Sequence, residues 1–257
     1  MRSMWNGLIS FGLVNIPVAL YTAVEDKQLR FNQLHKEDGG RIGYDKVCKH
    51  CGKSLEAEEI VRGYEYEKDR YVTLSDEELD KFAGVTSRAI ALQEFVDAAD
   101  IDAIYFDKAY YLDPEEAGKM PYALLLEALK RAKKVGVAKM VMRDKEYLAL
   151  IRPLDQVLVL STMHFPDELR KPEGIGLPSA ETKLGKRELE MADLLIKSMS
   201  GKFKPADFQD TYREELLEVL LAKAEGAEYQ SVEEKKRLPT KVVDIVAHLK
   251  ASIDQAE

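Results

Sequence analysis

The sequence predicts a mixed α+β fold, in which a β-rich part containing one embedded helix precedes a helical C-terminal part. Residues 5–24 combine aromatic and β-branched residues with Gly and Pro and show no helical stripe, which favours strands. Residues 121–135 have the clearest helical periodicity of the chain. After residues 166–178, where Pro and Gly mark a loop, the pattern becomes helical.

The embedded helix is predicted from its ends as well as from its stripe. Pro121 suits the first helical position, and Gly136 suits the C-terminal cap. Lys130, Arg131 and Lys134 lie off the apolar stripe, so part of the basic charge of this region lies on the exposed face of the helix. The stripe consists of Tyr122, Leu125, Leu126, Leu129 and Ala132.

Three strands are predicted after this helix, at residues 137–142, 146–152 and 156–163. The tight connection Arg143-Asp144-Lys145 joins the first two and places two cations at a hairpin tip. Earlier in the chain, residues 87–96 and 103–112 alternate like strands.

Between the N-terminal strands and residue 87, the chain is irregular. Residues 30–71 contain Gly39-Gly40, a CxxC motif and short polar alternations, which indicate an extended excursion built from short strands. Ser75 can cap a short helix, since acidic residues follow it where the helix dipole favours them. Leu79 and Phe82 give that helix an apolar side.

The C-terminal part is predicted to consist of helices. Residues 186–200 align Leu189, Ala192, Leu195, Ile196 and Met199 on one face. Residues 205–223 start at Pro205 and carry Phe208, Tyr212, Leu216 and Leu220. A charged linker at 233–237 leads to a short helix that aligns Val242, Ile245, Val246 and Leu249.

Composition indicates an ordinary globular protein of 257 residues, 46% hydrophobic and 33% charged. No apolar run approaches the roughly 20 residues of a membrane helix, so no membrane partner is expected. Polar and helix-breaking residues interrupt the apolar stretch 8–19, which argues against a signal peptide. The two cysteines share one CxxC and provide no disulfide framework. We therefore expect a cytoplasmic protein.

The net charge of −8 is unevenly distributed. Residues 1–118 carry 14 basic and 23 acidic side chains, and residues 188–257 carry 10 and 15. Residues 119–152 instead carry nine basic and three acidic side chains, a net charge of +6. This basic segment is compatible with a solvated surface, and also with a basic groove or interior in an otherwise acidic protein.

Sequence motifs give little support to catalysis, and we predict that the protein is not an enzyme. There is no phosphate-binding P-loop, and Gly174-Ile175-Gly176 lacks the third glycine and the strand-to-helix setting of a dinucleotide site. The four histidines are scattered and match neither HExxH nor a nucleophile pattern. A thiol- or metal-dependent enzyme that uses the CxxC is the rival interpretation.

The motif Cys48-Lys49-His50-Cys51-Gly52 is the one sharp local signal. A redox pair would be expected at a helix N-terminus in a βαβ setting, which the sequence does not indicate. The motif is more similar to half of a zinc knuckle, in which a turn directs two thiolates at one metal. Two readings stay open: a pair of reduced surface thiols without metal, or a structural zinc shared with a second chain. No cofactor is required in either case.

A succession of segments along nearly the whole chain resembles the bacterial Ku proteins. Their order is more specific than any single segment. They are residues 5–18 (WNGLISFGLVNIPV), 60–66 (IVRGYEY), 74–79 (LSDEEL), 135–139 (VGVAK), 150–153 (LIRP), 198–203 (SMSGKF) and 249–252 (LKAS).

This resemblance implies a β-barrel core with an inserted bridge arm and a C-terminal helical clasp. Residues 1–178 would form the core, with the bridge arm at about 32–88; residues 179–230 would form the dimerisation arm, and 231–257 a linker and short helix. Two chains would form a ring that binds double-stranded DNA ends in non-homologous end joining, at the bacterial nucleoid. The resemblance also implies an ATP-dependent DNA ligase as partner, usually through the C-terminal region.

Many family members continue past the LKAS segment into a Lys-rich tail, whereas this chain stops at Glu257. Sliding or bridging that depends on the tail is therefore not carried over to this chain. The sequence leaves open whether the tail is naturally absent or has been removed.

A ring that accepts any broken end must contact phosphate and sugar rather than bases. We predict that eight cations line it, two of them (Arg41 and Arg70) in the bridge arm. The other six are Lys133, Lys134, Arg143, Lys145, Arg170 and Lys171.

Overall fold

The computed structural model of this chain describes residues 2–75, 77–78, 88–143, 145–179 and 185–226. It divides into two compact units, residues 1–171 and 172–257, which are described separately below. The domain limits expected from the sequence, after residues 178 and 230, stay predictions.

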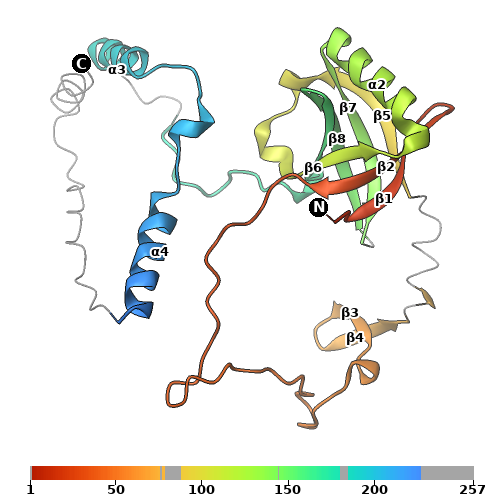
Figure 1. Cartoon of the computed structure of the whole chain (residues 1–257), viewed down its shortest axis with the longest axis vertical. Helices are drawn as coiled ribbons and strands as arrows, with labels where there is room; N and C mark the ends of the chain where they lie inside the picture. The colour runs from red at the N-terminus through yellow and green to blue at the C-terminus, as the bar shows by residue number, and fades with distance from the viewer. Residues whose placement is uncertain (1, 76, 79–87, 144, 180–184, 227–257) are drawn as a thin grey trace. The chain divides into compact units, whose positions relative to one another are not determined.

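The first unit contains a closed β-barrel (Figure 1). Around the barrel the strands follow the order β1-β2-β6-β9-β8-β7-β5. The barrel core and the mixed α+β class are therefore confirmed. The strands are β1 (Trp5–Phe11), β2 (Val14–Thr22), β5 (Ala89–Asp97), β6 (Phe106–Pro114), β7 (Lys134–Met142), β8 (Lys145–Leu154) and β9 (Val157–Met163).

Neighbouring strands of the barrel are antiparallel except at one seam. There, β1 and β5 run parallel through the pairs Leu8↔Ala89, Ile9↔Ile90 and Ser10↔Ala91. Residues 23–88 leave the barrel after β2 and return at β5, so the seam lies where the inserted segment rejoins the barrel.

The barrel interior holds the main hydrophobic core. Ile9, Val18, Leu112 and Leu160, from four different strands, are fully inaccessible to solvent. A smaller cluster around Val135, Leu150 and Met163 lies against the segment after β5, with Ile101 and Tyr105 packed on it. The outward-facing side chains of β7 and β8 on that side are therefore covered by the segment that follows β5.

Helix α2 (Lys119–Ala132) packs across one end of the barrel and contributes Tyr122, Leu125 and Leu129 to the main core. The apolar stripe predicted for this helix is confirmed except at Ala132, which is exposed, and its predicted cap is wrong. Lys133 takes the left-handed cap conformation, with φ 53°, and its backbone N–H donates to the carbonyls of Leu129 and Lys130. Gly136 lies within β7, where a Cβ would overlap Leu92.

The Tyr122 hydroxyl joins α2 to the barrel wall. It donates a 2.7 Å hydrogen bond to the carbonyl of Leu112 in β6 and accepts one of 2.7 Å from the N–H of Leu158 in β9. Burial raises the pKa of Tyr122, so the hydroxyl keeps its proton at neutral pH. Two paired strands and one helix therefore meet at a single buried oxygen.

The inserted segment forms little regular structure. It contains the hairpin of β3 (Arg62–Glu67) and β4 (Arg70–Leu74), the short 3-10 helix η1 (Ala57–Glu59), and two isolated bridges, Leu34↔Arg41 and Val47↔Ser54. This agrees with the extended excursion expected from the sequence. None of its described residues from 23 to 75 is buried.

The helix start predicted at Ser75 has the expected reciprocal hydrogen bonds. The N–H of Glu78 donates to Ser75 Oγ at 3.2 Å, and the N–H of Ser75 donates to Glu78 Oε2 at 2.9 Å. Leu79 and Phe82 lie outside the described residues.

The second unit contains α3 (Lys186–Ser198), the 3-10 helix η6 (Pro205–Asp207) and α4 (Thr211–Ala224). The single helix predicted from residue 205 is wrong. Phe208 is extended, with φ −110°, and Asp210 caps α4 by accepting a 3.0 Å hydrogen bond from the N–H of Arg213. The linker and short helix predicted after residue 230 lie outside the described residues.

Within the described part of the chain, no helix is both long enough and apolar enough to cross a membrane.

Replacing Tyr122 by Phe is expected to lower the free energy of unfolding by roughly 2 kcal/mol, because the Leu112 carbonyl and the Leu158 N–H would both lose a buried partner. Urea denaturation monitored by circular dichroism measures the change. Tyr21→Phe is the control, since that ring is partly exposed and its hydroxyl has no hydrogen bond within the described residues; a change within about 0.5 kcal/mol is expected. Equal stability of Tyr122→Phe and the native chain would contradict the role given to this hydroxyl.

Candidate nucleic-acid interface

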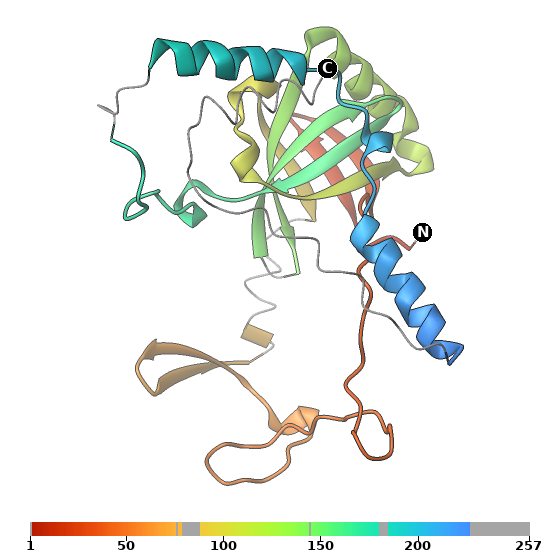
Figure 2. The same cartoon turned by 90° about the vertical axis from the view of Figure 1, so that its left-hand side faces the viewer.

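The hairpin of β7 and β8 projects beyond its neighbours at the barrel end opposite α2 (Figure 2). The pairing of β7 with β5 ends at Lys139, and the pairing of β8 with β9 begins at Leu148. Met140–Met142 and Lys145–Tyr147 therefore pair only with each other among the described strands. This places the tip, including Arg143 and Lys145, outside the barrel wall.

Arg143 and Lys145 lie together at this tip, as the sequence predicts. Arg143 is exposed, has a φ of 52° and forms no ion pair with any described residue. Burial of Tyr110, followed by the negative charge of Asp107, raises the pKa of Tyr110, and the positive charge of Arg143 acts in the opposite direction. The tip therefore presents one cation without a carboxylate partner in the described structure.

Lys145, by contrast, is held by Glu168 of the 3-10 helix η5 (Pro166–Glu168) at 2.9 Å. The Lys145 ammonium also lies 5.3 Å from the ring centre of Tyr147. The hydrogen bond to Glu168 raises the pKa of Lys145, and the same bond lowers the pKa of Glu168. A phosphate that binds Lys145 must compete with this carboxylate.

Lys139 is a cation of the same region that our sequence predictions omitted. It points outward from β7, 3.6 Å from Glu146, and lies 5.8 Å from the ring centre of Phe165. The signal was available: residue 139 falls within the basic segment and alternates with the inward residues 138 and 140 of the predicted strand.

Lys133 and Lys134 lie at the other end of β7. Lys134 pairs with Asp97 at 2.8 Å, whereas Lys133 is exposed and has no ion pair with the described residues. The eight-residue rise from Lys134 to Met142 corresponds to about 26 Å. The basic segment thus forms two groups at opposite ends of one strand instead of a single patch.

The remaining predicted cations are exposed. Arg170 and Lys171 follow η5 and have no ion pair within the described structure. In the inserted segment, Arg41 donates a 2.6 Å hydrogen bond to Asn32 Oδ1. Arg70 pairs with Glu67 at 2.8 Å and lies 5.4 Å from the ring centre of Tyr66.

Both ends of the inserted segment attach to the barrel at the end where the β7–β8 hairpin projects. β2 ends at Thr22, beyond the Trp5↔Leu20 pair, and Trp5 Nε1 donates to the carbonyl of Val141 at 3.2 Å. β5 begins beside Leu8 and reaches Lys139 of β7 at Ala91. The segment that carries Arg41 and Arg70 is therefore rooted at the same barrel end as Arg143 and Lys145.

Cys48 and Cys51 occupy a tight turn, not a helix N-terminus. The N–H of Gly52 donates to the carbonyl of Cys48 at 2.8 Å, and the N–H of Cys48 donates to the carbonyl of Lys53 at 2.9 Å. No group of three or more His, Cys, Asp or Glu side chains able to hold a metal occurs among the described residues. The described chain therefore presents half of a tetrahedral site.

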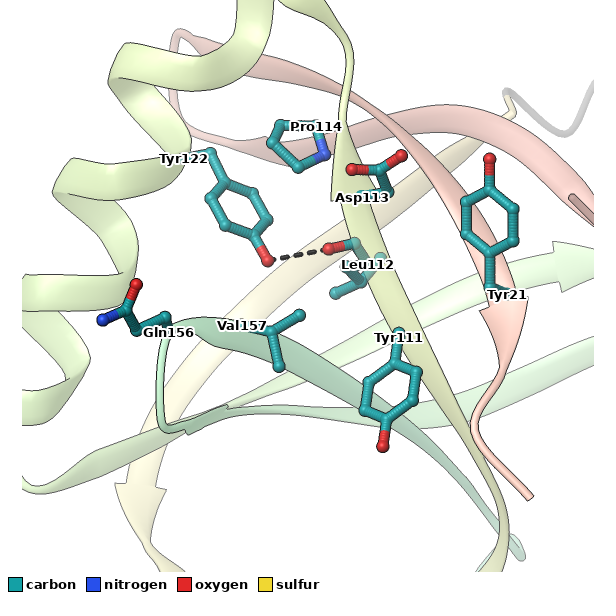
Figure 3. A pocket seen from close by; sticks show the side chains of 8 residues that line it. All are labelled: Tyr21, Tyr111, Leu112, Asp113, Pro114, Tyr122, Gln156 and Val157. Atoms are coloured by element: carbon teal, nitrogen blue, oxygen red, sulfur yellow. Dashed lines mark hydrogen bonds between the residues drawn. The ribbon is translucent and has the colours of Figure 1, made fainter. Parts of the chain in front are cut away.

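A shallow groove of about 590 Å³ lies on the barrel wall near the C-terminal end of β6 (Figure 3). Tyrosines dominate its lining, and Asp113 is its one charged residue. A surface with a carboxylate and no cation disfavours phosphate, so we place no DNA contact there. The lining comprises Tyr21, Tyr111, Leu112, Asp113, Pro114, Tyr122, Gln156 and Val157.

Comparison with known proteins gives consistent matches over the chain. A model described as the Ku70/Ku80 beta-barrel domain matches residues 10–191. The protein named non-homologous end joining protein Ku 2 of Saccharopolyspora erythraea is 43% identical, covering 100% of this chain and 84% of that protein. The proteins named non-homologous end joining protein Ku of Bacillus subtilis and Archaeoglobus fulgidus are 41% and 40% identical; each match covers 99% of this chain, with 82% and 99% of the relative.

Proposed function

The chain belongs to the Ku family, and from this premise we propose that it forms a homodimeric ring that binds ends of double-stranded DNA in non-homologous end joining. The observation that carries the proposal is the similarity, over nearly the full length, to proteins named for end joining. The outward cations at the β7–β8 hairpin supply a surface with the required charge.

Recognition is expected to be independent of sequence. Broken ends have arbitrary base sequences, so Lys and Arg must contact the phosphate backbone, which is the same at every end. Arg143 and Lys145 lie at the projecting tip of the β7–β8 hairpin and Lys139 lies on β7 just before it, not in a groove-filling helix, and this suits contact with the DNA backbone.

Specificity for ends follows from topology. A closed ring around a duplex can be loaded only where the duplex terminates, so ends are selected without any contact that distinguishes them chemically. The rooting of the inserted segment beside the cationic hairpin supports this proposal, because the DNA path would be enclosed by elements that leave one end of the barrel.

The second subunit of the ring would bind the helices of the C-terminal unit. No residue of α3 or α4 is buried in the single chain. Large apolar side chains such as Ile196, Met199, Phe208 and Tyr212 are between 64% and 73% exposed. Apolar surface of this extent is typical of a protein–protein interface, and a second copy of the chain is the partner that the family implies.

We extend the proposal to an ATP-dependent DNA ligase as a further partner, bound through the C-terminal region. The family resemblance supports this partner; residues 227–257 lie outside the described structure.

Two rival functions make different predictions. A thiol- or metal-dependent enzyme would need an acid or base beside Cys48 and Cys51, and it would show catalytic turnover. A general architectural DNA binder would bind circular and linear DNA equally well.

The proposed ring is expected to bind a linear duplex of any sequence, with poor competition from hairpin-capped or circular duplex of the same length. Electrophoretic mobility shift with these three DNAs measures the difference. Affinity should fall with salt with a log–log slope of about −0.9 per phosphate neutralised. Equal competition by circular DNA would refute end threading and favour the architectural binder.

The double variant Arg143→Glu, Lys145→Glu is expected to weaken binding of linear duplex and to make the salt slope shallower by about 2, since two phosphate contacts are lost. The fold should survive, because both side chains are exposed. Fluorescence anisotropy across a salt series measures both quantities. Unchanged affinity would show that the tip faces away from DNA.

Glu168→Gln provides the opposite test, since it releases Lys145 while Gln can still accept the hydrogen bond from the Phe165 N–H. We expect binding a few-fold tighter than that of the native chain. Glu127→Gln is the matched control: it releases Arg131 from a pair of the same 2.9 Å length and changes the net charge equally. Equal gains in both variants would indicate a nonspecific effect of net charge.

Ile196→Asp with Met199→Asp is expected to convert the dimer to monomer at micromolar concentration and to abolish binding of DNA ends. The reason is that the introduced carboxylates would be desolvated at an apolar interface. Sedimentation velocity measures the assembly. Lys197→Asp, an exposed position on the same helix, is the control and should leave the dimer intact. A folded native monomer that binds DNA ends would contradict the proposed ring.

A further inference from the structure

The groove near the C-terminal end of β6 combines aromatic rings with a single carboxylate (Figure 3). Tyr21 of β2 and Tyr111 of β6 are direct cross-strand partners, so their side chains project from the same face of the barrel wall. Asp113 shares that face, because it lies two residues beyond Tyr111, and Leu112 between them points into the core. Two rings and a carboxylate therefore face outward within one short stretch of paired strands.

The polar groups of this groove have no partner among the described residues. The Asp113 carboxylate forms neither an ion pair nor a hydrogen bond with a described side chain or backbone group. The hydroxyls of Tyr21 and Tyr111 likewise form no hydrogen bond with any residue that the structure describes. A ligand can therefore bind these groups without displacing a contact of the described protein.

The wall behind the groove is fixed by the barrel. The Tyr122 hydroxyl ties the Leu112 carbonyl to the Leu158 N–H, and Leu112 and Tyr122 both line the groove. Val159, which pairs with Tyr111, is 1% exposed although it belongs to neither of the two core clusters. Because this wall is already ordered, binding costs little conformational entropy in the protein.

The charge at the groove favours a cationic ligand. Among the described residues, no Lys or Arg lines the groove. On the β9 side, the nearest cation in register is Arg152 of β8, which Val159 separates from Tyr111 by two strand spacings, or about 10 Å. Glu115 and Asp155, each next to a lining residue in the chain, are exposed and add negative charge near the rim.

Arginine is the cation that this set of groups fits best. A guanidinium is planar, so it stacks on tyrosine rings such as those of Tyr21 and Tyr111 and still donates hydrogen bonds to a carboxylate. A divalent metal would need several oxygen ligands, whereas Asp113 is the one carboxylate that lines the groove. Pro114 and Val157 are half-buried and offer apolar surface to a residue beside the arginine.

We propose that this groove is a docking site for a partner protein, which inserts an arginine side chain from an extended segment that carries an apolar residue next to it. The guanidinium lies against the rings of Tyr21 and Tyr111 and pairs with Asp113. The apolar residue packs on Val157 and Pro114.

The docking site and the proposed DNA contacts lie toward opposite ends of the barrel. Phe106 is the end of β6 nearest the β7–β8 hairpin, since it pairs with Met163, which pairs with Leu148. The rise from Phe106 to Asp113 corresponds to about 24 Å along β6. A partner can therefore occupy the groove while Arg143 and the rest of the hairpin tip contact DNA, so the inference goes beyond the proposed function and does not depend on it.

The experiment uses the full chain and a capped, fluorescein-labelled peptide of sequence Ala-Leu-Arg-Leu-Ala. Its matched control carries citrulline in place of arginine, which keeps the shape of the side chain and removes the charge. Fluorescence anisotropy should show saturable binding of the arginine peptide and about five-fold weaker binding of the citrulline peptide, the upper range for an exposed ion pair. Methyl NMR should show a shift of Val157 and none of Val135, which lies in the other cluster of the barrel wall.

Variants of the groove locate the contact. Asp113→Asn is expected to bind the arginine peptide about five-fold more weakly, and Tyr111→Leu about three-fold more weakly. Glu115→Gln is the matched control, since it removes the same charge from an exposed residue outside the lining, and it should retain native affinity. If the guanidinium contacts Asp113, replacing arginine by citrulline should cost almost nothing further in Asp113→Asn. Circular dichroism checks that each variant folds.

Four results would overturn the inference: no saturable binding of the arginine peptide, equal affinity of the two peptides, equal losses in Asp113→Asn and Glu115→Gln, and a shift of Val135 as large as that of Val157. Binding of linear duplex by Asp113→Asn is measured in parallel and should equal that of the native chain. Tighter duplex binding by this variant would place the groove on the path of DNA and would also rule out the docking site. Failure of the native chain to bind DNA ends would refute the proposed function and leave the peptide result standing.

Discussion

The fold depends on the close approach of β5 to β1, which closes the barrel at its one parallel seam. Gly7 makes this approach possible: a Cβ there would overlap both the Trp5 ring and the carbonyl of Arg88. The N–H of the next residue, Leu8, donates to that same carbonyl at 3.0 Å. Trp5 in turn donates to Val141 of β7, so one aromatic residue connects the two strands that flank β5.

This seam also determines where the functional elements lie. More than sixty residues separate β2 from β5, and closing so long a loop costs only slightly more entropy than closing a short one. The insertion is therefore tolerated, provided that both of its ends return to the same barrel end. The register of β1 with β2 and β5 meets this requirement, and it brings the insertion beside the hairpin that carries Arg143 and Lys145.

An acidic chain can still offer cations to a phosphate, because the carboxylates that pair with those cations are solvent-accessible and can be displaced. Glu168, Asp97 and Glu67 each pair with one of the predicted DNA-contacting cations, and all three pairs are at least partly exposed. Exposed pairs contribute only about 0–1 kcal/mol, so a phosphate can displace the carboxylate at little cost. Arg143, which no described carboxylate holds, would then bind first, and Lys145 would exchange partner as the duplex enters.

Local periodicity predicted the elements better than it predicted their ends or their partners. The stripe of α2 was evident because Tyr122, Leu125 and Leu129 recur at helical spacing. The cap was mispredicted because Gly136 is needed for close packing against Leu92, while Lys133 adopts the left-handed cap conformation itself. The pair between Lys145 and Glu168 joins residues 23 positions apart, and only the barrel register places them together. The closed barrel was likewise predicted only from the family resemblance, because no spacing in the sequence specifies a parallel pair of β1 and β5.

The inserted segment relies on polar contacts and backbone hydrogen bonds instead of a hydrophobic core. Its hairpin of β3 and β4 is two-stranded, and a hairpin of this kind is at best marginally stable alone in water. Apolar packing cannot stabilise the segment, because every described residue from 23 to 75 is at least partly exposed. The directional contacts that remain are charge, as at Arg70 with Glu67, and the preorganised turn at Cys48. In the proposed ring, exposed cations of this segment such as Arg41 and Arg70 would contact phosphate, which an apolar surface could not bind. The proposed contact with DNA would then add, through these charged side chains, the stabilising interactions that the apolar side chains of the segment do not provide.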